Sequence, residues 1–363
     1  MSLGANKQAL MGAAGASSAA SGLYSYQIGN SIRMSTSANS RLYRTAGTPT
    51  SSDKMTLSFW VKRHDGSDDG ANNLMFTAGT GGGSYFYMQF EGPGDGIKME
   101  NVGGNQGTGY FTTNAVFPDP FAWYHIIFRI DTTQSSADDR IRLYVNGELL
   151  TDYNNTTMRD NTAQDEDFSY LNQSGVVQNL VGQSGIGTGT VGANLSFADV
   201  AFYDGQSYYS EIGEFHNGVW RPKDPSSLTF GDNGYWLKFA SSGSLGTDSS
   251  GNGNNFTVSN VGAEDQLLDS PTFGDSSSGN FAVLSSKIPS VFDGYLTLGE
   301  AATYMTRSSA GNYMTIGSQG ASSGKYYYEV YWNADSGVNN VAWGWINWQD
   351  NVNGIDKGDI QVP

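Results

Sequence analysis

The side chains that most often carry catalysis are sparse in this chain. It has no cysteine, three histidines (His64, His125 and His216) and no Gly-x-Ser-x-Gly nucleophile motif. His125 falls in an alternating strand pattern, a position typical of a packing residue. Hydrolysis of a glycosidic bond needs two carboxylates roughly 5–10 Å apart across a cleft. The nearest acidic clusters, 165–167 and 211–214, are expected in a solvated loop and a turn, so we predict that the protein is not an enzyme.

Coordination of a hard cation by oxygen atoms is a second kind of chemistry that the sequence suggests. A loop that begins at Asp65, with the sequence Asp-Gly-Ser-Asp-Asp-Gly, has oxygen-bearing side chains at its first, third and fifth positions and then a glycine. The twelfth position, where an EF-hand loop carries glutamate, is Phe76, so the loop is not an EF-hand. Asp65, Asp68 and Asp69 are the candidate ligands of a weakly bound calcium ion, and turn formation is the alternative. The loop at 248–253 has the same partial spacing, and the sequence requires no cofactor.

Recognition of a sugar needs an exposed aromatic ring together with groups that bind hydroxyls. The candidates for such contacts are Trp60, Tyr110, Tyr153 and Tyr208. Trp60 lies on the strand face opposite Leu57, where it either stacks on a sugar or packs under a neighbouring loop or subunit. With 8 Trp, 21 Tyr and 18 Phe in the chain, most aromatic residues are expected in the core or at interfaces.

The composition excludes several classes of protein. Lysine and arginine number 19 against 35 aspartate and glutamate residues, so the formal net charge is −16 at pH 7. Binding to a phosphate backbone depends on Lys and Arg, which argues against a nucleic-acid partner. The absence of cysteine excludes a disulfide framework and favours folding in a reducing cytosol.

Neither a membrane span nor a secretory signal is predicted. No stretch of 18 or more apolar residues occurs, so membrane insertion is not expected. Residues 1–22 are rich in Gly, Ala and Ser and lack the strongly apolar core of a signal peptide. Such a segment cannot form a core of its own, and we predict a non-globular arm that a partner orders.

The body of the chain alternates apolar and polar residues in short segments separated by Gly, Asn, Asp and Ser. Alternation with a period of two is typical of antiparallel strands with one buried and one wet face. The Asn146-Gly147 dipeptide predicts a type I′ hairpin turn. The pattern favours an all-β, antiparallel two-sheet sandwich. Strands are expected at residues 24–34, 55–62, 85–90, 123–131, 141–145, 197–203 and 235–239.

Composition shifts divide the chain into four parts. The arm at 1–22 is followed by the main sandwich at 23–225. Residues 226–285 are expected to form a strand and a linker rich in Gly, Ser and Asn, and residues 286–363 a second, short β-rich unit.

Four segments of the main part resemble the laminin-G-like, or concanavalin A-like, lectin sandwich family, and their order and spacing match it. The resemblance implies a lectin-like jelly roll, a scaffold used for binding. The segments are SFWVKR (58–63), FAWYHIIFRID (121–131), RLYVNGELL (142–150) and LSFADVAFYDGQSYYSEI (195–212).

The last part of the chain resembles the opening strands of SPRY-type sandwiches. The segments that carry this resemblance are SGKYYYEVYW (323–332) and NNVAWGWIN (339–347). SPRY sandwiches continue through several more strands, whereas this sequence stops at Pro363. Either the unit is incomplete here and the chain continues in a longer protein, or the match is a generic pair of strands.

The whole arrangement is similar to structural proteins of marine tailed bacteriophages. Besides the arm and the two β units, DSSGNGNNF (248–256) and LLDSPT (267–272) carry this similarity. It implies a virion protein assembled in the host cytoplasm, with residues 1–22 bound to other virion proteins and a homotrimer as the expected oligomer. Two functions fit: a fibre or spike adhesin whose sandwich binds host-surface polysaccharide, or a purely architectural fibre-stalk or capsid-decoration protein without a glycan ligand.

Overall fold

The chain divides into two units, Met1–Phe281 and Ala282–Pro363. The computed structural model describes residues 24–35, 40–64, 73–81, 83–91, 96–104, 107–117, 122–182 and 193–272, and the backbone of 296–299 and 304–307. The predicted arm, the loop of Asp65, Asp68 and Asp69, and most of the predicted unit at 286–363 lie outside the described residues. In the part that the structure describes, no helix is long and apolar enough to cross a membrane.

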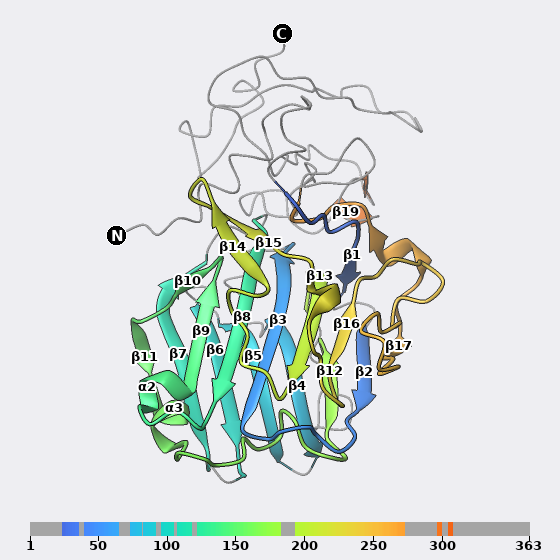
Figure 1. The fold of residues 1–363 in the computed structure, drawn as a ribbon. Helices are drawn as coiled ribbons and strands as arrows, with labels where there is room; N and C mark the ends of the chain where they lie inside the picture. Colours follow the sequence, from blue (N-terminus) through green and yellow to red (C-terminus); the bar gives the residue numbers. More distant parts are fainter. Residues whose placement is uncertain are drawn as a thin grey trace, which may run out of the picture. The chain divides into compact units, whose positions relative to one another are not determined.

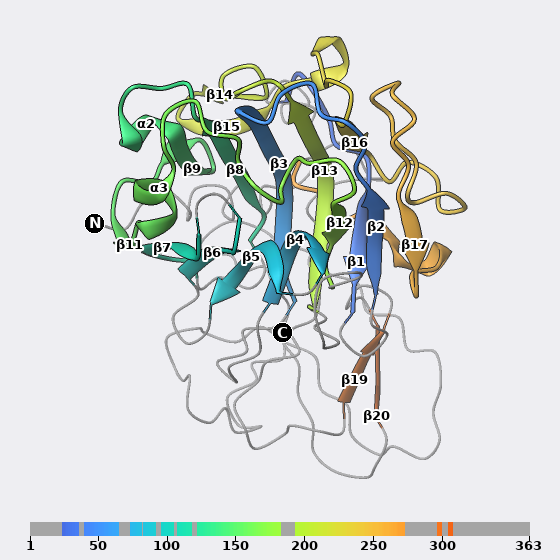
Figure 2. The same cartoon turned by 90° about the horizontal axis from the view of Figure 1, so that it is seen from below.

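The first unit is a sandwich of two antiparallel sheets, which confirms the predicted all-β fold class (Figures 1 and 2). The first sheet has the order β10-β9-β8-β3-β13-β1-β18, and β16 pairs with β13 off this path. Its strands are β10 (Glu148–Leu149), β9 (Ile141–Val145), β8 (Tyr124–Asp131), β3 (Lys54–Arg63), β13 (Leu195–Asp204), β1 (Ser31–Met34), β18 (Gln266–Leu267) and β16 (Tyr235–Leu237).

The second sheet has the order β11-β7-β6-β5-β4-β12-β2-β17. Its strands are β11 (Tyr153–Asn155), β7 (Gly109–Val116), β6 (Gly96–Val102), β5 (Ser84–Glu91), β4 (Asn73–Gly81), β12 (Val177–Leu180), β2 (Arg41–Thr45) and β17 (Thr257–Ser259). Short helices α2 (Ala137–Arg140), α3 (Thr157–Asn161), η2 (Pro225–Ser227) and η3 (Ala263–Asp265) lie in the connections. In the second unit, β19 (Leu296–Gly299) pairs with β20 (Tyr304–Arg307).

Strand alternation builds the core between the two sheets. In β3, Leu57, Phe59 and Val61 are fully buried in this core. Phe59 lies opposite Ile126 of β8 and packs edge-on against Phe197 of β13, with ring centroids 5.7 Å apart. The apolar face predicted from the sequence is therefore the face that the second sheet covers.

The outer face of the first sheet is not wet, and the sequence expectation of one wet face is wrong here. A hairpin, β14 (Gly213–His216) with β15 (Val219–Pro222), places Trp220 on this face, where its Nε1 donates to His125. Asn146 and Gly147 have φ of 49° and 80°, as the predicted turn requires, and a Cβ on Gly147 would lie 2.1 Å from the Trp220 ring. The buried residues of this second apolar cluster are Ile28, Trp60, Trp123, Ile127, Tyr144, Ala198, Ala201, Tyr203, Ile212, Trp220, Phe230 and Trp236.

Residues 235–267 contribute three strands to the sandwich, although the sequence pattern placed 226–285 outside it as a strand and a linker. Strand β16 pairs with β13, β17 with β2, and β18 with β1. The polar residues at 248–255 lack apolar periodicity because hydrogen bonds organise them, and Phe256 at the end of this segment packs in the core against Tyr235.

The two ends of the sandwich lie side by side. In the β1–β18 pair, Ser31 is opposite Leu267, and the Ile28 N–H donates to Thr272 Oγ1 at 2.8 Å. Lys62 Nζ binds the Asp269 carboxylate at 2.8 Å, and both side chains are buried. We call the group formed by Ile28, Ser31, Lys62, Asp269 and Thr272 the terminal clasp.

A buried carboxylate fastens the N-terminal segment to the first sheet. Asp199, which sits at a register shift in β13 with φ of 50°, accepts hydrogen bonds from Tyr26 Oη (3.0 Å) and Trp236 Nε1. Burial raises the pKa of the Asp199 carboxyl to about 6, and these hydrogen bonds oppose the rise only in part.

This raised pKa predicts a pH-dependent stability. The folded state holds the Asp199 proton more tightly than the unfolded chain, whose pKa is near 3.8. The free energy of unfolding should therefore fall as pH rises from about 4 to about 6, by on the order of 2 kcal/mol from this group. Asp199→Asn, which tolerates the positive φ, should remove that contribution. Urea unfolding of both proteins across this range measures it, and parallel pH profiles would contradict the assignment.

Candidate functional site

The outer face of the second sheet carries a row of aromatic and charged side chains. In β5, Phe86, Met88 and Phe90 are buried in the core, so Tyr85 and Tyr87 point the other way. These two tyrosines are half-buried.

The register of the sheet places a glutamate between two tyrosines. Tyr87 of β5 lies opposite Glu100 of β6, which lies opposite Tyr110 of β7. At a strand spacing of about 4.8 Å, the two tyrosines are roughly 10 Å apart. Lys98, two residues before Glu100, lies on the same face.

These side chains hold one another in position. Tyr87 donates a hydrogen bond to the Glu100 carboxylate, and the Tyr85 and Tyr87 rings stack with centroids 6.0 Å apart. Lys98 Nζ lies 4.9 Å from the Tyr110 ring centroid and 5.9 Å from that of Tyr87. We call these five residues, Tyr85, Tyr87, Lys98, Glu100 and Tyr110, the tyrosine face.

The tyrosine face presents hydroxyl groups and a lysine that is paired with two glutamates. Burial, and to a smaller extent the nearby Glu100 carboxylate, raises the pKa of both Tyr85 and Tyr87 above the ordinary value of 10. Lys98 Nζ pairs with Glu91 at 3.4 Å and with Glu100 at 3.7 Å. Three preorganised rings with hydroxyl donors and carboxylate acceptors between them suit a ligand with both apolar ring faces and hydroxyl groups.

Of the four aromatic residues predicted as sugar contacts, only Tyr110 lies on this face. Trp60 is 1% exposed, stacks on His125 with ring centroids 4.6 Å apart and belongs to the second apolar cluster, on the outer face of the first sheet. Tyr153 packs on Phe111 of the core with centroids 4.3 Å apart, and Tyr208 packs edge-on against Tyr203. The four residues therefore do not form one site.

The remaining residues of the tyrosine face were missed in the sequence analysis. Tyr85 and Tyr87 fall on the polar side of the alternating segment at 85–90, and this alternation could have placed them on the outer face of the sheet. Lys98 and Glu100 alternate with the buried Ile97 and Met99 in the same way.

The structure offers no support for a cation site in the polar loop at 248–253. The Asp248 carboxylate accepts hydrogen bonds from the backbone N–H groups of Trp236 (2.9 Å), Ser250 (2.8 Å) and Asn254 (2.8 Å), and from the Ser250 hydroxyl. This side chain organises a turn, as the alternative interpretation held. Across the described residues, no group of three or more His, Asp and Glu side chains could hold a metal ion.

His125 is a structural residue. Its Nδ1 accepts a hydrogen bond from Trp220 Nε1 at 2.8 Å, so the proton of the neutral ring is on Nε2, which donates to Ser58 Oγ at 2.8 Å. Burial lowers the pKa of His125 to about 3. The ring therefore cannot accept the Ser58 proton, and this Ser–His pair is unsuited to general-base catalysis.

The acidic clusters considered from the sequence also lack catalytic geometry. Burial and the neighbouring Asp167 raise the pKa of Asp53, and the two carboxyls share a hydrogen bond. That contact is closer than the roughly 5 Å separation of a glycosidase pair. Glu214 instead accepts a hydrogen bond from Arg221 Nε at 2.9 Å, and Glu211 accepts one from the Tyr209 N–H at 3.0 Å.

Comparison with solved structures finds lectin-like folds at low sequence identity. A candidate carbohydrate-binding protein from Bacteroides ovatus is 15% identical, with 64% of this chain and 58% of that chain covered and a TM-score of 0.43. The LG4-5 domains of mouse laminin α1 are 14% identical, covering 51% of this chain and 44% of that one, with a TM-score of 0.34. The sialyllactose-bound CBM40 domain of a Ruminococcus gnavus sialidase is 17% identical, covering 40% and 74%, with a TM-score of 0.28.

The chain thus spans little more than half the length of the first of these structures. No curated protein sequence matches it significantly. The Laminin_G_3 family model, described as the concanavalin A-like lectin/glucanases superfamily, matches residues 35–183. Residues 35–183 are therefore similar to concanavalin A-like lectin domains.

Proposed function

We propose that the protein is a non-catalytic adhesin whose tyrosine face binds a neutral surface polysaccharide. The observation that carries this proposal is the row of Tyr87, Glu100 and Tyr110 across three strands on the outer face of the second sheet. Aromatic rings supply surfaces for the apolar faces of sugar rings, and the fixed hydroxyl and carboxylate groups supply partners for sugar hydroxyls.

Charge favours a neutral ligand over an anionic one. Two glutamates already pair with Lys98, the one lysine of the tyrosine face, and the chain as a whole carries a net charge of −16. A sulfated or carboxylated polymer would therefore meet net repulsion during approach and binding.

Substitution of Tyr87 tests the site. Tyr87→Ala removes the central ring and the hydroxyl that binds Glu100, and the affinity for a bound polysaccharide should fall about tenfold or more. Binding of the purified protein to an array of bacterial polysaccharides, followed by calorimetry with the best ligand, measures this change.

Tyr43→Ala is the matched control. Tyr43 is a half-buried tyrosine on β2 of the same sheet, beside Arg41, and three strand spacings from β5 place it roughly 14 Å away. Unchanged affinity in Tyr87→Ala, or an equal loss in Tyr43→Ala, would refute the tyrosine face as the site. If no polysaccharide binds at all, the architectural alternative without a glycan ligand takes its place.

The virion setting of the proposal rests on the sequence similarity to tailed-phage structural proteins. In that setting residues 1–22 attach the protein to another virion protein, and the assembled adhesin is a homotrimer. Particles produced with a chain that lacks residues 1–22 should then lack the protein, and normal incorporation would contradict the attachment role.

A further inference from the structure

The ammonium group of Lys98 lies against the two rings that a sugar would use on the tyrosine face. Its Nζ is over the ring of Tyr110, 4.9 Å from the centroid, and over that of Tyr87, 5.9 Å from the centroid. Both distances are within the range of cation–π attraction. A sugar also packs on the face of an aromatic ring, so Lys98 and a bound sugar compete for the same two tyrosines.

The register of the strands places Lys98 between two glutamates. Side chains on one face of a strand are two residues apart. Glu100 is in register with Tyr87 and Tyr110, and Lys98 comes two residues before it on β6. Glu91 of β5 lies opposite the residue two before Lys98. A movement of the ammonium from Glu100 toward Glu91 therefore takes it away from the row of tyrosines.

Both glutamates pair with this ammonium, and they differ in freedom. Lys98 Nζ lies 3.4 Å from Glu91 Oε1 and 3.7 Å from Glu100 Oε2. The Glu100 side chain is 12% exposed and accepts the hydrogen bond from Tyr87, whereas the Glu91 side chain is 39% exposed. Glu100 is thus fixed beside the rings, and Glu91 can follow the lysine outward. Lys98 can leave the rings and still keep one carboxylate partner.

We propose, on the basis of the function proposed above, that Lys98 is a gate of the tyrosine face. In the closed state its ammonium lies over the rings of Tyr87 and Tyr110, between the two glutamates. When a neutral sugar chain binds, Lys98 turns toward Glu91 and uncovers both rings. Lysine suits this movement because its charge sits on a flexible four-carbon stem. The closed state lowers the affinity of the site, since a ligand must first shift the population of Lys98 toward the open state.

Lys98→Ala distinguishes a gate from a ligand contact by the sign of its effect. Without the ammonium, the affinity for a polysaccharide bound at the tyrosine face should rise about three- to tenfold. If Lys98 instead bound the sugar, the substitution would lower the affinity. The probes are dextran, galactomannan and laminarin, three neutral polysaccharides with different linkages. Calorimetry with the full chain measures the dissociation constant of each for the wild type and the variant.

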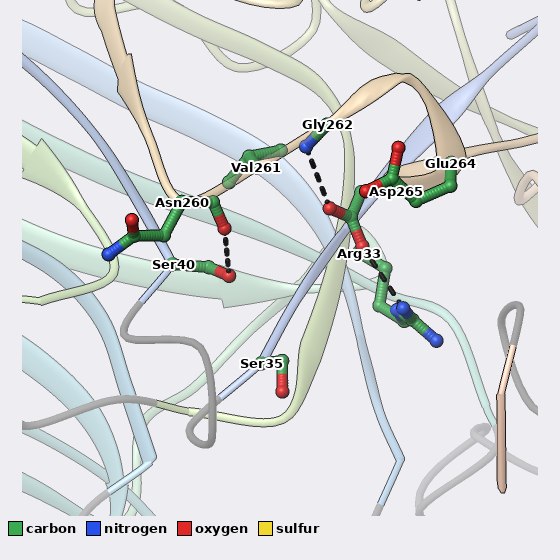
Figure 3. Close-up of a pocket in the computed structure, with 8 residues that line it drawn as sticks. All are labelled: Arg33, Ser35, Ser40, Asn260, Val261, Gly262, Glu264 and Asp265. Atoms are coloured by element: carbon green, nitrogen blue, oxygen red, sulfur yellow. Dashed lines mark hydrogen bonds and ion pairs between the residues drawn. The ribbon is translucent and has the colours of Figure 1, made fainter.

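Glu91→Gln tests the position to which Lys98 moves. The open state then loses its ion pair, while the closed state keeps Glu100, so the affinity should fall about threefold. Glu264→Gln is the matched control and should leave the affinity unchanged. Figure 3 shows Glu264, an exposed glutamate at a cavity of about 430 Å³ that is lined by residues of β1 and η3 and lies away from the tyrosine face.

The closed state has a signature of its own in NMR spectra of the full chain. Protons that lie over an aromatic ring resonate upfield, so the ε-CH₂ protons of Lys98 should lie upfield of those of other lysines. Their signal is assigned by its loss in Lys98→Ala, and Tyr110→Ala should reduce the upfield shift. Saturation with the polysaccharide that binds best should move the signal back toward the ordinary lysine position.

The outcomes separate failure of the gate from failure of the proposed function. Polysaccharide binding that depends on Tyr87, with an unchanged or lower affinity in Lys98→Ala, would overturn the gate and leave the binding site in place. An upfield signal that is absent, or that persists at saturation, would do the same. Binding that does not depend on Tyr87, or no binding to any of the polysaccharides, would refute the proposed function and the gate with it.

Discussion

Asp204→Ala is expected to lower the free energy of unfolding of the sandwich by about 3–5 kcal/mol. The Asp204 carboxylate is fully buried and accepts four hydrogen bonds. The donors are the N–H groups of Thr50 (2.7 Å), Ser51 (3.1 Å) and Asn233 (2.9 Å) and the side-chain amide of Asn172 (2.7 Å). Alanine would leave the Asn233 N–H and the Asn172 amide buried without this acceptor, and the partly buried N–H groups of Thr50 and Ser51 would also lose it.

The Asp204 carboxylate joins three separate segments of the chain. Its partners come from the loop before β3, the loop before β12 and the turn before β16, so their packing depends on this one side chain. Asp232→Ala is the matched control, because Asp232 is an exposed aspartate in the same turn and its loss should change stability by less than about 0.5 kcal/mol. Urea unfolding measures the stability of both variants. A decrease in the free energy of unfolding below about 1 kcal/mol for Asp204→Ala would contradict the role of this carboxylate in joining the three segments.

Trp220→Ala should destabilise the sandwich by a similar amount, about 3–5 kcal/mol. Trp220 is 3% exposed and stacks on Tyr209 with ring centroids 5.6 Å apart. It fills the space above Gly147 and Gly213, at each of which a Cβ would lie 2.1 Å from the indole. Its removal leaves a cavity on the outer face of the first sheet and a buried His125 Nδ1 without its donor.

Trp220→Phe separates these two effects. Phenylalanine retains most of the ring but loses the hydrogen bond to His125, so a loss of about 1–2 kcal/mol is expected. Thermal unfolding measures the stabilities of the wild type, Trp220→Phe and Trp220→Ala, which should decrease in that order. Equal stability of the wild type and Trp220→Ala would show that the hairpin does not contribute to the fold. Polysaccharide binding by the folded fraction should persist, because the tyrosine face lies on the other sheet.

The sequence predicted the inward face of the main strands well, since alternation is a local signal. It failed on the opposite face of the first sheet for a physical reason. Ser58, Trp60 and Lys62 form the more polar side of β3, which suggested exposure. Lys62 can be buried because its charge pairs with Asp269, 207 residues further along the chain. Alternation within one strand holds no information about such a partner.

The candidate site shows the same division between local and non-local signals. The outward position of Tyr85 and Tyr87 could be derived from β5 alone. Their alignment with Glu100 and Tyr110 depends on the register between three strands, which loops of differing length set. Likewise, the turn-forming character of residues 248–253 was predictable, but the Trp236 N–H that Asp248 accepts was not.

The terminal clasp has a mechanical consequence. Ser31 begins β1 and lies opposite Leu267, the last residue of the antiparallel β18, so a pull on the two ends of the sandwich opens this strand pair bond by bond from one end. The Lys62–Asp269 and Ile28–Thr272 contacts lie between the pulled ends and that pair, and they carry the load first. The force then passes along one edge of the first sheet and bypasses β5, β6 and β7. A sandwich tethered through both ends could therefore stretch at its clasp while its tyrosine face keeps its geometry.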